Sequence, residues 1–201
     1  MTNAEKLELG DILYGVIAPC IVAALIIIFP AYLKPLIADP TLKAIFIDGL
    51  GEAILIIAVP MLFGLLWNRW AGGASGFLLG SIYALYINDM YVQYSTTYPQ
   101  YQPFDISTLG YIVCAMLTGY LAGSLNKGSF SFLRMIVAGL VSGIIGGLFL
   151  LWTMIISPLG MATDIPYTTF IVLLPRIIYG IIMPLIAKVF IWYNVLPRRP
   201  A

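Results

Sequence analysis

Long apolar runs separated by short polar connections dominate the pattern of hydrophobic and polar positions along this chain. A membrane-crossing helix needs about 20 mainly apolar residues, and six segments meet that requirement. The connections between them are rich in residues that favour turns, mainly Pro, Gly, Asn, Ser and Thr. We therefore predict an all-α integral membrane protein, a single six-helix transmembrane domain over residues 1–201. The predicted spans are Ile12–Leu33, Leu42–Leu66, Gly73–Met90, Ile106–Leu125, Phe132–Ile156 and Tyr167–Tyr193.

Composition agrees with this class and argues against several others. The chain is 61% hydrophobic and 9% charged, with a net charge of +1, whereas a soluble domain carries many more charges. No basic cluster suggests nucleic-acid binding. Histidine is absent and the two cysteines lack the spacing of a metal or redox motif. Because no nucleophile with an activating base stands out either, we expect no catalysis, no metal and no cofactor.

The distribution of basic residues predicts the orientation of the helices. Six spans place both termini on the same side of the membrane, and an excess of Lys and Arg marks the cytoplasmic side. The opposite side holds Lys34 and Lys43 in its first connection, but its other two connections contain no Lys or Arg. We therefore expect cytoplasmic termini in a multi-pass protein of the cell (plasma) membrane. The residues that set this orientation are Lys6, Arg69, Lys127, Arg134, Arg198 and Arg199.

Small residues recur at every fourth position in three of the predicted spans. Such spacing lets helix backbones approach closely and pack through dispersion contacts. On the predicted topology these glycine ladders lie toward the cytoplasmic side, so three helices are expected to converge there; ordinary helix packing is the simpler alternative. The ladders are Gly72, Gly76 and Gly80; Ala115, Gly119 and Gly123; and Gly139, Gly143 and Gly147.

Four ionisable residues inside or at the ends of the spans are predicted to lie at one depth toward the outer side. Asp48 and Glu52 share one helix face because they are four residues apart. Asp89 closes the third span, and Arg176 follows Pro175 in the sixth. Charges within a membrane are costly unless they face protein, water or a partner. We expect Arg176 to pair with Glu52 or Asp48 and the remaining carboxylates to line an outward-facing substrate site; a salt bridge that fixes helix registry is the alternative.

The connection after the third span is rich in tyrosine and glutamine. It holds Tyr91, Tyr94, Tyr98 and Tyr101. Such a segment is suited to a lid that stacks on a planar or cationic small molecule, and we include Tyr94 among the candidate binding residues. An aromatic belt at the membrane interface is the alternative and needs no ligand.

The stretch AGGASGFLLGSIYALYIND, residues 71–89, resembles the glycine-rich third helix of the substrate-capture (S) components of energy-coupling factor (ECF) transporters. The six-helix topology is similar as well. The resemblance implies a protein that binds a vitamin-like micronutrient and topples on docking to a coupling subunit with two ATPases. In that family the first helix presents small residues to the coupling subunit, but here Pro19 interrupts them.

Two function classes therefore remain open, and a third has less support. The first is a small-molecule capture component of an uptake transporter, whose partners would be the lipid bilayer, the ligand, a coupling subunit and ATPases. The second is a non-catalytic accessory subunit of a multisubunit membrane complex, in which the charges fix helix registry. A small channel that uses the charges as a relay is the third, but the two halves of the sequence show no inverted repeat.

Overall fold

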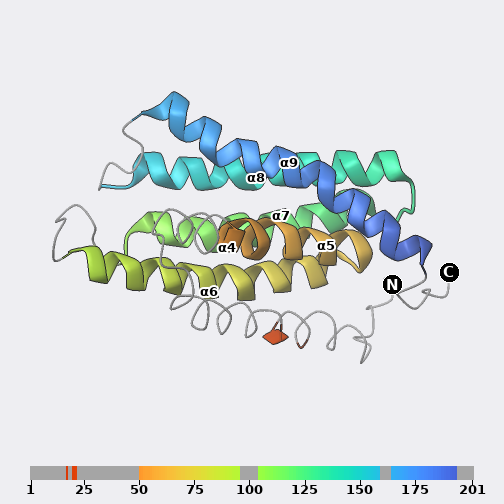
Figure 1. Ribbon diagram of the computed structural model, residues 1–201, viewed down its shortest axis with the longest axis horizontal. Helices are drawn as coiled ribbons and strands as arrows, with labels where there is room; N and C mark the ends of the chain where they lie inside the picture. The colour runs from red at the N-terminus through yellow and green to blue at the C-terminus, as the bar shows by residue number, and fades with distance from the viewer. Residues whose placement is uncertain (1–16, 18–19, 22–49, 96–103, 159–163, 194–201) are drawn as a thin grey trace, which may run out of the picture.

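The computed structural model describes residues 17, 20–21, 50–95, 104–158 and 164–193. All regular structure in this part of the chain is helical, and the long helices run roughly side by side (Figure 1). Four helices are long and apolar enough to cross a membrane. The predicted first span and the start of the second lie outside the described residues. The elements are α4 (Leu50–Glu52), η3 (Ala53–Ala58), α5 (Val59–Leu66), α6 (Arg69–Ser95), α7 (Ile106–Asn126), α8 (Phe132–Ile156) and α9 (Ile165–Trp192).

The second predicted span is a helix with an irregular middle. After α4 the backbone follows the wider π-helical pattern in η3, and α5 then continues as an α-helix with Pro60 in its first turn. Proline has no N–H group, and its ring clashes with the carbonyl four residues earlier. The wider π-helical turn before Pro60 relieves that conflict without ending the helix.

Polar residues at the ends of α7 and α9 set where these helices begin and end. Asp105 and Asp164 accept hydrogen bonds from backbone N–H groups of the first turn, at 2.8 and 3.2 Å respectively, as N-cap residues do. At the other end of α7, Lys127 and Gly128 have φ angles of 50° and 69°. This left-handed backbone turns the chain out of the helix and toward α8.

Helix α7 lies at the centre of the described bundle. It packs against α5 and α6 on one side and against α8 on the other, while α9 covers α8 and also reaches η3 and α5 (Figure 1). The core between them is mainly apolar, with buried polar side chains that include Thr118, Asn126 and Arg176. The outer surfaces of α8 and α9 are apolar too, with exposed side chains such as Leu148, Trp152, Phe170 and Ile178. A surface of this kind suits contact with lipid rather than water.

Apart from the Glu52 and Arg176 pair, the charged residues of the described helices are segregated between the two ends of the bundle. The end where α5 meets α6 and α7 meets α8 is the basic end, defined by Arg69, Lys127, Arg134 and Lys188. The opposite end, where α6 ends and where α7 and α9 begin, is the acidic end, defined by Asp89, Asp105 and Asp164. The positive-inside rule associates an excess of Lys and Arg with the cytoplasmic side of a membrane, and the basic end has that excess.

Candidate functional site

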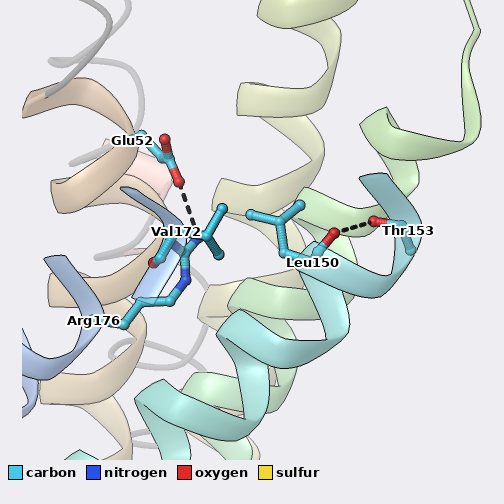
Figure 2. A network of polar contacts seen from close by, with 5 residues as sticks. All are labelled: Glu52, Leu150, Thr153, Val172 and Arg176. Carbon is cyan, nitrogen blue, oxygen red and sulfur yellow. Dashed lines mark hydrogen bonds and ion pairs between the residues drawn. The ribbon is translucent and has the colours of Figure 1, made fainter. Parts of the chain in front are cut away.

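Arg176 of α9 is the charged residue around which the candidate site is built. Its side chain is 1% exposed, and its Nη2 atom donates to Oε1 of Glu52 at 2.9 Å (Figure 2). A second guanidinium nitrogen, Nη1, donates to the carbonyl oxygen of Val172 one turn earlier in α9. The side chain of Glu52, by contrast, is 30% exposed. The pair thus joins α4, at the start of the irregular second span, to α9. Of its two side chains, only that of Glu52 is partly exposed.

Two glycines of α8 make room for this buried arginine. A methyl group at Gly147 would lie 2.5 Å from Cδ of Arg176, and one at Gly143 would lie 2.9 Å from the Arg176 carbonyl oxygen. Both distances are shorter than side-chain packing permits. The glycine ladder of α8 therefore brings α9 close enough for the Arg176 side chain to extend between the helices toward Glu52.

Polar side chains of α7 lie beside the pair. Tyr111 and Cys114 are both buried and lie within electrostatic range of Glu52 and Arg176. Thr118 lies one turn further along α7 and is also buried. Among the described residues, neither Nε of Arg176 nor Oγ1 of Thr118 has a hydrogen-bond partner. The Cys114 thiol lies close enough to both Arg176 and Thr118 to serve as a weak hydrogen-bond partner for them.

The described side chains of the cluster offer charges and hydrogen-bonding groups to a ligand. They are one cation, one carboxylate, a phenol and a thiol. A carboxylate that is both paired and partly exposed can exchange its partner for a ligand cation or a ligand hydrogen-bond donor. The arrangement suits recognition of a small polar molecule.

The remaining predicted binding residues lie apart from this pair or outside the described part of the chain. Asp89 is exposed near the end of α6, where its Oδ2 atom accepts a hydrogen bond of 2.7 Å from Nε2 of Gln93 on the next turn. Tyr94 lies in the last turn of α6, whose bounds place it on a helix rather than on the predicted connection. Asp48 lies outside the described residues.

The glycine ladders are divided between two helix interfaces rather than converging at one place. Gly72 and Gly76 of α6 face the backbone of Gly119 and Ala115 in α7. The α8 ladder of Gly139, Gly143 and Gly147 instead faces Gly180, Arg176 and Leu173 of α9. The expected convergence of three ladders at the cytoplasmic side is therefore replaced by two separate close approaches, because α7 and α9 lie on different sides of α8.

Two buried polar contacts were missed by sequence reasoning. At the acidic end, Asp105 accepts from Ser157 Oγ at 2.8 Å, which ties the start of α7 to the end of α8. Toward the basic end, Asn126 Nδ2 donates to the Leu65 carbonyl at 3.0 Å. Asp105 follows a Pro-Phe pair directly before an apolar run, and this N-cap pattern was the available signal. The Asn126 contact spans 61 positions and left no local signal.

Comparison with known proteins adds no relative. No protein-family model, curated protein or solved structure matches the chain.

Proposed function

We propose that this protein is a membrane-embedded capture component for a small, vitamin-like molecule, which serves an uptake transporter and has no ATPase of its own. The observation that carries the proposal is the pair of Arg176 and Glu52, in which a fully buried cation meets a carboxylate that is 30% exposed. Ionisable residues inside membrane helices mark ligand or ion sites by default. The π-helical turn that follows Glu52 adds support, because such turns recur at functional sites.

The charge distribution favours a particular class of ligand. The end of the bundle that we assign to the outside carries Asp89, Asp105 and Asp164, so a neutral or cationic molecule would approach it more readily than an anion. In the six-span topology that we propose, both termini are cytoplasmic and the capture site opens away from the cytoplasm. The membrane is then the plasma membrane, and the coupling subunit and ATPases would be separate chains.

Ligand-dependent stability of the purified full-length protein tests this proposal. We would record thermal unfolding in mild detergent with a panel of water-soluble vitamins and small organic cations. A ligand present at 100 times its Kd stabilises the native state by about 2.7 kcal/mol. The stabilisation should be lost in Glu52→Gln and kept in Asp164→Asn, which removes a carboxylate that is exposed at the acidic end. A stabilising ligand whose effect is the same in both variants would place the site elsewhere.

A second candidate function has its own support, namely a non-catalytic subunit that packs into a larger membrane complex. Gly143 and Gly147 of α8 fit closely against Arg176, which pairs with Glu52 of α4. The ion pair would therefore fix the relative positions of α8, α9 and α4. Extraction from the native membrane and mass spectrometry of the co-purifying chains separate the two functions. ATPases with a coupling subunit support capture, and a stoichiometric set of enzyme subunits supports the accessory role.

A further inference from the structure

A cavity of about 370 Å³ lies at the basic end of the bundle, far from the Arg176 pair along the helices. It is formed where the turn between α5 and α6 meets the end of α7. Its walls include Trp67, Arg69 and Trp70 on one side and Ser124 and Lys127 on the other. None of the functions considered above uses this cavity.

The polar groups of the cavity are chemically suited to an anion. Arg69 and Lys127 supply two positive charges, and no acidic residue is among the described residues that line the walls. The hydroxyl oxygen of Ser124 is buried and has no hydrogen-bond partner in the described part of the chain. Two cations and an unused hydroxyl around one cavity match the several acceptor oxygens of a phosphate group.

The backbone at this point does not oppose a negative charge. The carbonyl end of α7 would repel an anion if its oxygens were free. Three of these oxygens are already engaged: Gly123 accepts from the N–H of Lys127, Leu125 from Nε of Arg134, and Asn126 from the N–H of Ser129. From the other wall the N-terminal end of α6 contributes the positive end of its helix dipole.

The aromatic residues place the cavity where a membrane surface would lie. Trp70 is 60% exposed and packs edge-on against Tyr120. The centre of its ring lies 5.5 Å from the guanidinium carbon of Arg69. At the far end of α9, Trp192 and Tyr193 are exposed as well. Tryptophan and tyrosine prefer the headgroup level of a bilayer, and anionic lipids there attract lysine and arginine.

We propose that the cavity between Arg69 and Lys127 binds a phosphate group, supplied by an anionic phospholipid headgroup or by a soluble phosphate. The two cations would hold the phosphate oxygens, Ser124 would donate its hydroxyl hydrogen, and the tryptophans would flank the group at the membrane surface. An occupied cavity would join the α5–α6 turn to the end of α7.

Binding to the delipidated full-length protein in non-ionic detergent tests the proposal. Native mass spectrometry would follow titration with phosphatidylglycerol, with phosphatidylcholine and with inorganic phosphate. We expect one molecule of phosphatidylglycerol to bind more tightly than phosphatidylcholine. An interfacial cation contributes about 1 kcal/mol, so Arg69→Gln and Lys127→Gln should each weaken binding about fivefold. Arg69→Lys, which keeps the charge, should retain most of the affinity.

Lys188→Gln provides the matched control, because Lys188 lies at the same end but does not line the cavity; its Nζ atom donates to the Phe130 carbonyl. The affinity of the Lys188→Gln variant for phosphatidylglycerol should equal that of the wild type. Binding of inorganic phosphate with the same dependence on Arg69 and Lys127, and without lipid preference, would support the site and assign it to a soluble phosphate. If neither probe binds, or if K188Q weakens binding as much as K127Q, the proposal is wrong.

Discussion

The α6–α7 and α8–α9 interfaces carry the same small-residue spacing but use it differently. In the first, Gly76 faces the carbonyl group of Ala115, so one backbone packs directly on the other. In the second, Gly147 faces the aliphatic part of the Arg176 side chain. Backbones also meet in the second interface, where Gly139 faces the carbonyl oxygen of Gly180, but beside Gly147 this interface provides space for a charged side chain as well. A glycine ladder in the sequence therefore predicts close approach but not what the approach accommodates.

The largest expected effect comes from breaking the ion pair between Glu52 and Arg176, whose side chain lies along the α8–α9 interface. Arg176→Met leaves Glu52 without its cation, and Glu52→Gln leaves a buried guanidinium without its counter-charge. Removal of one partner of a buried pair costs about 3–5 kcal/mol, because the remaining charge is uncompensated. We expect losses of this size in the free energy of unfolding, measured by denaturant titration in mixed micelles.

The double variant Glu52→Gln/Arg176→Met completes this experiment. Replacement of a buried pair by uncharged side chains of similar volume is often neutral, so the double variant should recover most of the stability lost in either single variant. Independent, additive losses would show that the two residues do not act as a pair. Full stability combined with loss of ligand-dependent stabilisation would assign the pair to binding rather than to registry.

A smaller effect is expected from overpacking the first interface. In Gly76→Ala the new methyl group would lie 2.5 Å from the carbonyl carbon of Ala115, a backbone atom that cannot move without separating the helices. Overpacking of this kind costs about 1–3 kcal/mol. Gly73→Ala is the matched control on the same helix, since its methyl group would meet Tyr120 at an ordinary 3.4 Å. Equal unfolding free energies for the two variants would contradict the close backbone contact.

The sequence predicted the parts of this fold that depend on local pattern. The fourth and fifth spans begin at Ile106 and Phe132, as predicted. Asp105 caps the fourth through its side chain, whereas the fifth begins where the apolar run follows Ser131. Helix α6 was predicted too short at both ends: it begins at Arg69 and continues to Ser95. Polar residues at its ends lowered the apolar signal there without interrupting the helix, because Ala, Arg and Gln favour helical geometry and Tyr tolerates it.

The candidate site was predictable in part for a different reason. A charge in an apolar helix requires a partner, so the sequence pattern paired Arg176 with Glu52 or Asp48. Arg176 contacts Glu52, while Asp48 lies outside the described residues. Sequence could not choose between the two carboxylates, because residues four apart lie on the same helix face. It also could not show that Gly147 packs on Arg176 rather than on another backbone, since spacing alone does not identify the facing helix.

The smallest expected effect is the one that distinguishes the two glycine ladders most directly. In Gly147→Ala the new methyl group would lie 2.5 Å from Cδ of Arg176 and 2.9 Å from Cδ2 of Leu173, both of them side-chain atoms able to move. We therefore expect a loss of about 1 kcal/mol, at the lower end of the overpacking range, and less than the loss in G76A. Because the arginine must shift, the loss should largely disappear when the same change is made in Arg176→Met. A loss as large as that of G76A, unchanged by the arginine substitution, would mean that Gly147 packs against a fixed neighbour, as Gly76 does, and that the ladder does not provide space for Arg176.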